Sequence, residues 1–407
     1  MRRLLCALAL LQGGCIDLDV LGNRLDQGVP DLRANDDGGL LGTDGAVHSD
    51  AGTGPCKIVS KPIVAGLTGR QGQPVAVASL GGEQFWFGLP SNGAPAQLYF
   101  VDLAMPKGPT SVLELVNTDG SSAAPHPQLS KGNTNSNNVT NALLEYWDGT
   151  AVRRYQFTPP ATLAYFDSVP PTGCTTNLVY GAALAQVGFA TARGCNGSLY
   201  IDAGNLTKNG TMNSFHIVTG LVSADVFSAP TGDRAYELYA ATSGVVLREV
   251  ILQPSPTSGS SSAPSGDNLL GLAGDVSAAG DYFAVGILPR NGQNELEIMH
   301  GMAPISGMPD APQFPAVNVA ASSTVDVAAG TLGSEHYALI VYEDERGGVW
   351  GRFKQGASTS TTAFLIASDG HVPQVAADRK GSSFVVTYLD DGSIGHYAQV
   401  TCSEPPK

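Results

Sequence analysis

Between Pro74 and Val400 the chain repeats one pattern seven times: an apolar strand, a Gly-rich turn, a second apolar strand ending near an aromatic residue, a polar turn and a third strand. The last copy shows it most clearly, with strands at 373–377, 383–388 and 393–400. Apolar residues alternate with a period near two, and no long amphipathic helix pattern occurs. The pattern therefore predicts an all-β protein built from repeated hairpins.

The spacing of the copies indicates which all-β architecture to expect. Measured between the residues that end the second strands, successive copies lie 60, 42, 50, 48, 55 and 46 residues apart. The mean, about 50 residues, is close to one propeller blade of four strands. We predict a seven-bladed β-propeller with antiparallel four-stranded blades. Six or eight blades are the alternatives; six would result if the second copy, which a polar Asn-rich tract at 132–138 interrupts, did not form a blade. The seven marker residues are Phe87, Trp147, Phe189, Tyr239, Ile287, Tyr342 and Tyr388.

Outer, fourth strands are weaker in the sequence. We expect them at 111–116, 163–169, 213–218 and 363–367. The last copy has no fourth strand of its own, but the apolar segment 57–66 could supply it by pairing antiparallel beside 393–400. This closure resembles the strand exchange that joins the first and last blades of many propellers.

The N-terminus has the features of an export signal. Arg2 and Arg3 precede an apolar stretch at 4–11, and two glycines precede Cys15. The arrangement resembles a bacterial lipoprotein signal, in which the cysteine after the cleavage site is acylated, although Gln12 departs from the usual pattern. The resemblance implies a signal peptide at 1–14 and lipidation of Cys15. An ordinary signal peptide, or an apolar start without that role, is the alternative.

Residues 15–55 alternate Asp with Gly and contain few large apolar side chains. Such a segment cannot offset the entropy of ordering, so we interpret it as a flexible tether before a propeller domain at 56–407. Its Asp/Gly spacing lacks the regular ligands and bidentate Glu of an EF-hand.

Four cysteines remain after Cys6 of the signal and Cys15, which in an exported chain suggests two disulfides. In the third copy Cys174 precedes the first strand and Cys195 follows the second, so antiparallel pairing brings them together. If 57–66 pairs beside the last strand, Cys56 and Cys402 become neighbours and lock the ring.

Composition limits the classes of partner. With 43% apolar and 14% charged residues the chain is globular. Without the two signal arginines it carries 20 basic and 36 acidic residues, a net charge near −16 with neutral histidines. Nucleic-acid binding, which needs a basic surface, is disfavoured. No run of about 18 apolar residues follows the N-terminus, so we expect membrane contact only through the lipid anchor.

Polar turn residues are the candidates for chemistry. Short zinc, phosphate-loop and nucleophile-elbow motifs are absent, and we assign no catalytic residue and no metal ligand. Carboxylates cluster in the turns between second and third strands of the last two copies, which adjacent blades would place on one rim. They suit glycoside cleavage, Ca²⁺ binding or, most simply, tight-turn chemistry. The rim candidates are Asp344, Glu345, Arg346, Asp390, Asp391, His371, Arg290 and Arg193.

A good scaffold without a recognisable reactive centre favours a binding protein. The chain resembles bacterial surface lipoproteins with propeller repeats, although it lacks the signatures that would name a subfamily. We expect a monomeric, non-catalytic, lipid-anchored propeller at a bacterial cell envelope, on the outer membrane, that binds a protein or glycan through one rim. The alternative is an exported carbohydrate-active hydrolase or lyase using carboxylates such as Asp344 and Asp390. A third hypothesis is a structural propeller that holds Ca²⁺, the only cofactor that we consider.

Overall fold

The computed structural model divides into two compact units, Met1–Val47 and His48–Lys407. The predicted signal peptide, residues 15–54 of the predicted tether, and the cysteines Cys6, Cys15 and Cys174 lie outside the described residues. The described residues are 55–60, 63–69, 74–81, 84–89, 96–102, 110–115, 127–131, 133–134, 140–147, 152–158, 162–169, 177–205, 212–228, 232–242, 244–253, 255–267, 269–278, 280–303, 305, 309–315, 317, 319–320, 324–332, 335–358, 361–378 and 383–403.

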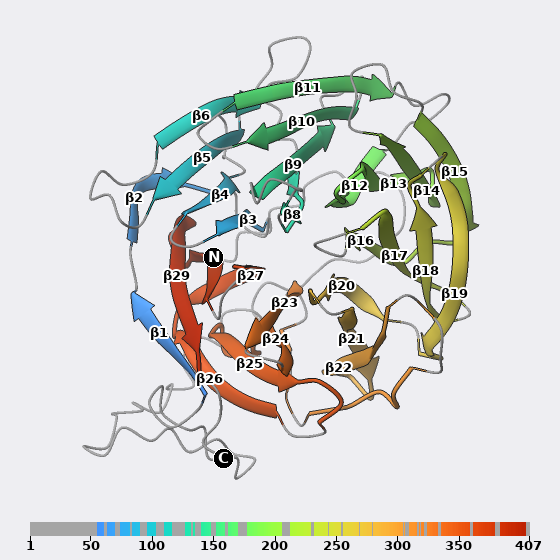
Figure 1. Cartoon of the computed structure of the whole chain (residues 1–407). Helices are drawn as coiled ribbons and strands as arrows, with labels where there is room; N and C mark the ends of the chain where they lie inside the picture. Colours follow the sequence, from blue (N-terminus) through green and yellow to red (C-terminus); the bar gives the residue numbers. More distant parts are fainter. Residues whose placement is uncertain are drawn as a thin grey trace, which may run out of the picture. The chain divides into compact units, whose positions relative to one another are not determined.

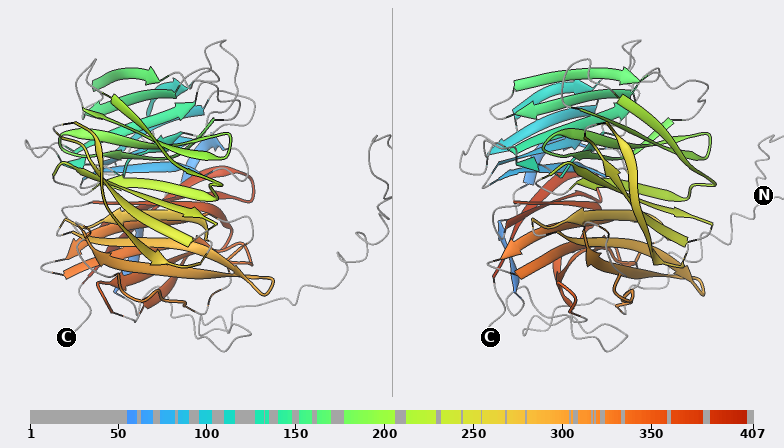
Figure 2. Two further views of the ribbon diagram at one scale, coloured as in Figure 1. Left: turned by 90° about the vertical axis from the view of Figure 1, so that its right-hand side faces the viewer. Right: turned by 45° about the vertical axis from the view of Figure 1, so that its right-hand side comes forward.

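These residues form seven antiparallel sheets arranged in a ring, which confirms the predicted seven-bladed β-propeller (Figure 1). In side view the strands of each sheet run between the two faces of the ring (Figure 2). We number the blades in chain order, and in each one the chain runs from the innermost strand outward. None of the described residues forms a helix long and apolar enough to cross a membrane.

The strand bounds follow the predicted repeat closely. Blade 1 holds β3 (Ala76–Gly81), β4 (Gln84–Leu89), β5 (Ala96–Asp102) and β6 (Thr110–Leu115). Blade 2 holds β7 (Gln128–Leu129), β9 (Thr140–Trp147), β10 (Val152–Thr158) and β11 (Thr162–Val169), with β8 (Asn133–Thr134) beside β9. Blade 3 holds β12 (Asn177–Leu184), β13 (Gly188–Cys195), β14 (Ser198–Asn205) and β15 (Met212–Thr219).

The remaining blades continue the ring. Blade 4 holds β16 (Ser223–Ser228), β17 (Arg234–Ala241), β18 (Gly244–Ile251) and β19 (Thr257–Ser265). Blade 5 holds β20 (Leu270–Val276), β21 (Asp281–Arg290) and β22 (Gln293–Met302). Blade 6 holds β23 (Val325–Leu332), β24 (Glu335–Glu343), β25 (Val349–Gln355) and β26 (Thr361–Ala367). Blade 7 holds β27 (Gly370–Ala377), β28 (Ser383–Asp390), β29 (Ile394–Cys402) and β1 (Cys56–Ser60), with β2 (Ile63–Thr68) also pairing β29.

The N-terminal strand closes the ring as predicted. β1 pairs antiparallel with β29, and Cys56 lies directly opposite Cys402 in the register. The two cysteines form a disulfide across 346 residues of sequence. Cys195 is also disulfide-bonded. The last blade is therefore built from both ends of the propeller domain.

Because successive strands are antiparallel, each inner strand begins at the same face of the ring. We call this the entry face. It also carries the turns between second and third strands, whereas the opposite face carries the turns between first and second strands.

Apolar contacts between neighbouring blades make the core. Between blades 4 and 5, for example, Phe227, Leu238, Leu247, Val276 and Tyr282 belong to one buried cluster. Burying one large apolar side chain contributes about 1.5–3 kcal/mol. The blades thus hold each other through side chains on the faces of their sheets.

Candidate functional site

Three consecutive inner strands carry an aspartate followed by valine: Asp225 in β16, Asp275 in β20 and Asp326 in β23. One oxygen of each carboxylate accepts the N–H of the following valine at 2.7–2.9 Å. The other accepts an N–H from the inner strand of the next blade at 2.8–2.9 Å, which ties neighbouring blades together. The donors on the next blade are Gly274, Ala329 and Val375 respectively.

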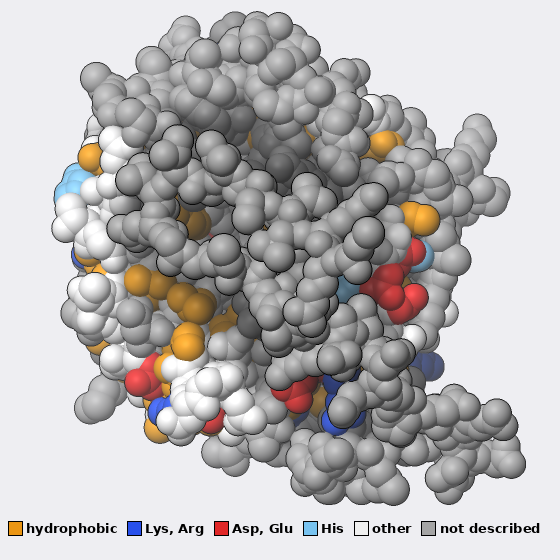
Figure 3. Space-filling model, turned by 180° about the vertical axis from the view of Figure 1, so that it is seen from behind, with side chains coloured by type: hydrophobic (Ala, Val, Ile, Leu, Met, Phe, Trp, Pro, Cys, Tyr) orange, Lys and Arg blue, Asp and Glu red, His pale blue; other side chains and the backbone are white. Residues whose placement is uncertain are grey.

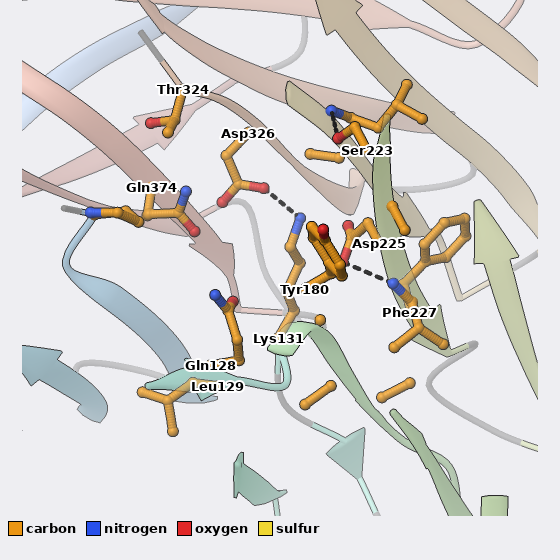
Figure 4. A pocket seen from close by; sticks show the side chains of 18 of the residues that line it. Gln128, Leu129, Lys131, Tyr180, Ser223, Asp225, Phe227, Thr324, Asp326 and Gln374 are labelled. Carbon is orange, nitrogen blue, oxygen red and sulfur yellow. Dashed lines mark hydrogen bonds and ion pairs between the residues drawn. The ribbon is translucent and has the colours of Figure 1, made fainter. Parts of the chain in front are cut away.

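Lys131, which follows β7, points into the central channel between these carboxylates (Figure 4). Its Nζ lies 2.7 Å from Oδ1 of Asp326 and 3.1 Å from the carbonyl oxygen of Gly274, and it also donates to the carbonyl of Val327. One ammonium thus joins blade 2 to blades 5 and 6 across the channel. Such a cross-channel contact holds the inner strands at a fixed separation.

Burial and charge act against each other here. Burial works to lower the pKa of Lys131, but the carboxylates of Asp326, Asp225 and Asp275 outweigh it and the pKa is raised. Burial raises the pKa of Asp225 to about 7 and raises that of Asp326, while Lys131 opposes both shifts. The lysine therefore stays charged and balances the carboxylates around it.

A pocket of about 210 Å³ lies beside this group in the channel. It reaches the beginnings of β16, β20 and β23 at the entry face, where Ser223, Gly271 and Thr324 line it. Figure 4 shows the side chains of Gln128 and Gln374 close to Lys131 and Asp326. The lining thus combines amides and hydroxyls, which both donate and accept, with charges that neutralise each other.

Two of the predicted rim carboxylates cap their own turns. Asp344 accepts the N–H groups of Arg346 and Gly348 at 3.1 and 2.9 Å and the indole N–H of Trp350 at 3.1 Å. Asp390 accepts the N–H of Ile394 at 2.8 Å and lies 2.9 Å from Nε2 of His396. Their carboxylate oxygens therefore accept hydrogen bonds from groups in or next to their own turns.

The structure does bring His371 together with carboxylates from two blades. Its Nδ1 lies 2.8 Å from Oε1 of Glu343 at the end of β24, and its Nε2 lies 2.7 Å from Oδ1 of Asp391 after β28. The following residue, Val372, has φ +46°, a left-handed conformation that is costly for a β-branched side chain, and its N–H lies 3.2 Å from the other oxygen of Glu343. His371 thus joins the end of β24 in blade 6 to the turn after β28 in blade 7.

The remaining candidates lie apart. Glu345 and Arg346 are exposed in the β24–β25 turn. Arg290 is exposed at the end of β21, 3.5 Å from Glu295 and over the ring of Phe314. Arg193 is 4% exposed and lies within the sheet of blade 3, where its Nε is 3.2 Å from Asp202. The structure therefore places Arg193 inside the propeller and not on its rim.

The sequence carried a signal for the channel group that the turn-based reasoning missed. The Asp-Val pairs recur 50 and 51 residues apart, the period of the repeat itself. Lys131 follows a two-residue strand and precedes a polar tract, and no pattern in that local sequence indicated its position in the channel. On the face seen in Figure 3 the described Lys and Arg side chains form no continuous patch, in keeping with the acidic composition.

No protein-family model matches the chain, and no curated protein matches it. Among solved structures it is similar to the WD40 domain of Toxoplasma gondii coronin, at 14% identity over 86% of this chain and 87% of that one, with a TM-score of 0.49. The Dos1 propeller gives 14% identity over 85% and 96%, with a TM-score of 0.48. The fucose-specific lectin of Aleuria aurantia gives 12% identity over 74% and 98%, with a TM-score of 0.46. Likenesses this distant carry no argument about a ligand.

Proposed function

We propose that the chain is a non-catalytic binding propeller that takes a glycan unit into its central channel pocket. The observation that carries this proposal is the pocket lining, in which Gln128, Gln374 and Thr324 present hydrogen-bonding groups beside an internally neutralised Lys131–Asp326 pair. Neutral ligands rich in hydroxyl groups need donors and acceptors in this mixture. The volume of the pocket equals that of about seven water molecules in the liquid, which is enough for one sugar ring.

The state of the carboxylates argues against the hydrolase alternative. A general acid or base must reach the reacting atom with a free oxygen or proton. In Asp225 and Asp326 both carboxylate oxygens already accept backbone N–H groups, and Asp344 and Asp390 cap turns. The raised pKa of Asp225, about 7, follows from its burial. These groups serve the fold, and none is left poised for glycoside cleavage.

The proposal also includes a cellular location for the propeller. The sequence of residues 1–55 supports a lipid anchor on Cys15 and a tether at a bacterial envelope, on the outer membrane. The tether ends where β1 begins, and Cys56 at that point is bonded to Cys402. A tether joined to the strand that closes the ring suits a propeller held at a surface. Metabolic labelling with a fatty acid in a bacterial host should label the wild-type chain and not Cys15→Ser.

A glycan array with the soluble C15S chain tests the binding function. We expect saturable binding to a limited set of glycans and a loss of about tenfold or more in the double variant Gln128→Ala/Gln374→Ala, because two pocket amides are removed. Gln293→Ala is the matched control, since Gln293 is an exposed amide on β22 away from the channel. Equal loss in the control, or binding that the double variant retains, would contradict the assignment to the pocket.

The same glycans distinguish binding from catalysis. Incubation followed by mass spectrometry should return each bound glycan intact. Shortened or unsaturated products would replace the binding function with a hydrolase or lyase, and D225N and D326N would then be the first variants to assay.

A further inference from the structure

The inner strand of blade 7, β27, is irregular directly before it reaches the channel pocket. His371 pairs with Leu389 and Gln374 pairs with Thr387, so β27 advances by three residues (371 to 374) where β28 advances by two (389 to 387). The one extra residue makes a β-bulge, a feature that re-aims the side chains next to it. Gln374 follows the bulge and lines the pocket, where its side chain lies close to Asp326 (Figure 4).

Val372, within the bulge, has an unfavourable backbone conformation. Its φ is +46° although it is β-branched, buried and followed by Pro373. A left-handed φ is costly for a β-branched residue, and the residue before a proline is normally extended. The other described non-glycine residues with positive φ lie outside strands: Asn196, Asn291 and Ser393. A conformation of this kind persists only where surrounding contacts hold it.

One carboxylate on blade 6 makes such contacts with two successive residues of β27. Oε1 of Glu343, at the end of β24, lies 2.8 Å from Nδ1 of His371, and Oε2 accepts the N–H of Val372 at 3.2 Å. Glu343 is only 5% exposed, so water competes little for its oxygens. Because φ is the rotation about the bond from that nitrogen to Cα, a relaxed Val372 would turn its N–H away from Glu343 or swing the chain that follows.

Blade 6 also holds β27 after the bulge. Oγ1 of Thr324, directly before β23, donates to the carbonyl oxygen of Pro373 at 3.4 Å. The N–H of Val375 donates to Oδ2 of Asp326 at 2.8 Å. Gln374 therefore lies between two sets of contacts with blade 6, and Glu343 supplies the set that holds the strained residue.

We propose that Glu343 is a positioning residue for the channel pocket, which it does not line: by holding Val372 at positive φ it sets the position of Gln374 in the pocket wall. Without Glu343, Val372 relaxes to negative φ and β27 loses its bulge. A register change of one residue turns side chains to the opposite face of a strand, so Gln374 moves out of its place. The consequence for binding rests on the glycan function proposed above, whereas the position of Gln374 does not.

NMR of the Cys15→Ser chain labelled with ¹⁵N-glutamine tests the position of Gln374 without any ligand. Its peaks are assigned by their loss in Gln374→Ala. In Glu343→Ala we expect the backbone and side-chain N–H peaks of Gln374 to move, and its backbone order parameter to fall from about 0.85, typical of rigid backbone, toward about 0.6. The peaks of Gln293, an exposed residue on β22, should stay in place.

Glu345→Ala is the matched control, because Glu345 is an exposed glutamate in the turn after β24. This variant should leave the Gln374 peaks unchanged. If Glu343→Ala does not fold, Glu343→Gln, which keeps one acceptor oxygen, takes its place. Unmoved Gln374 peaks in the folded Glu343 variant, or equal movement in Glu345→Ala, would overturn the positioning role.

Val372→Gly tests whether strain is the cause. Glycine adopts positive φ without a Cβ penalty, so in this background Glu343→Ala should move the Gln374 peaks much less than it does in the wild type. The comparison is between Val372→Gly alone and the double variant. Equal movement in both backgrounds would overturn strain at Val372 as the link between Glu343 and Gln374.

Glycan affinity measures the consequence for binding. For the glycan that the wild type binds most strongly on the array, Glu343→Ala should weaken binding about threefold to tenfold, the contribution of roughly one hydrogen bond. Unchanged affinity in a protein whose Gln374 peaks have moved would overturn the link to binding. A wild type that binds no glycan would contradict the proposed function, and the Gln374 peaks would still confirm or overturn the positioning.

Discussion

His371 links the ionisation of one residue to the contact between two blades. Both of its ring nitrogens face carboxylates, Glu343 on blade 6 and Asp391 on blade 7. Partial burial acts to lower the pKa of His371, but the hydrogen bonds to Glu343 and Asp391 outweigh it and the pKa is raised. A charged imidazole between two carboxylates is favoured by both neighbours.

The sign of the pH dependence follows from that shift. Because the folded-state pKa lies above the unfolded value of about 6.5, His371 contributes stability that is full below pH about 6.5 and is lost as the pH rises through the folded pKa. The contribution is small, since a third of the side chain is exposed. In thermal melts from pH 5.5 to 8.5, the melting temperature of the wild type should fall more steeply with rising pH than that of His371→Gln.

His216 supplies the control for this measurement, because it is an exposed histidine on the outer strand β15. His216→Gln should keep the wild-type slope of melting temperature against pH. Equal slopes of melting temperature against pH for the wild type and His371→Gln would show that the contacts of His371 with Glu343 and Asp391 do not contribute to stability.

Asp275 is the residue that tests the ties between inner strands. Both of its oxygens accept backbone N–H groups, from Val276 and Ala329. Asp275→Asn keeps one acceptor and turns an NH₂ group toward a buried N–H, so we expect a loss of about 1–3 kcal/mol in the free energy of unfolding. Denaturant titration measures it. The variant Asp233→Asn, at an exposed position, should stay within about 0.5 kcal/mol of the wild type, and an equal loss there would contradict a specific role for Asp275.

Among the elements, Gly274 of β20 sets how closely blade 5 approaches blade 4. A Cβ at this position would lie 2.1 Å from Cε1 of Phe227, a buried ring on β16. The N–H of Gly274 also donates to Asp225 at 2.8 Å. The glycine is therefore required by a close approach of strand and ring, with no positive φ involved.

Gly274→Ala should lower the free energy of unfolding by about 1–3 kcal/mol, because a packed ring and a hydrogen-bonded strand must both shift. Gly266→Ala is the matched control: nothing lies within 4 Å of its added Cβ. Adding Phe227→Leu should restore part of the loss, and a double-mutant cycle in denaturant measures the coupling. Additive effects of the two changes would contradict direct contact as the cause.

Strand alternation explains how much of the fold the sequence predicts. The blades were predictable because apolar residues recur at every second position along each strand. β1 was predictable because the last copy lacked a fourth strand. β19 was not, since its Thr257–Ser265 sequence is mostly serine and mostly exposed. Among its described residues blade 5 has three strands; the irregular residues 309–315 lie beside β22 instead, with Gln313 bridging to Ile298.

Site prediction reached less far, because a sequence shows a charge and not its surroundings. Asp391 was expected on the rim from its turn, and His371 from the crossover into the last copy; in the structure Nε2 of His371 lies 2.7 Å from Oδ1 of Asp391. Arg193 was read as a rim residue, yet it is buried against Asp202, which also lies 3.0 Å from Arg154. Asp202, the carboxylate that makes this burial tolerable, lies 9 residues from Arg193 and 48 residues from Arg154 in the sequence. A local sequence pattern cannot pair residues at such separations.

At the scale of the whole molecule, closure of the ring couples the first and last strands of the domain during unfolding. A propeller whose last blade is made from both ends of the domain cannot lose β1 without exposing the edge of β29. Cys56 and Cys402 lie directly opposite each other on those two strands. The hydrogen bonds of the β1–β29 pair align the cysteines, and the bond between them keeps the strands paired when the ladder opens.

The double variant Cys56→Ser/Cys402→Ser should therefore lose about 2–5 kcal/mol in the free energy of unfolding, since the bond constrains a loop of 346 residues in the unfolded chain. Guanidinium unfolding measures this, and amide hydrogen exchange should show β1 opening first in the variant, because its remaining ties are ladder hydrogen bonds at one edge. Reducing agent gives the internal control: it should destabilise the wild type more than the variant, by the contribution of this one bond. A variant as stable as the wild type under oxidising conditions would mean that strand pairing alone closes the ring.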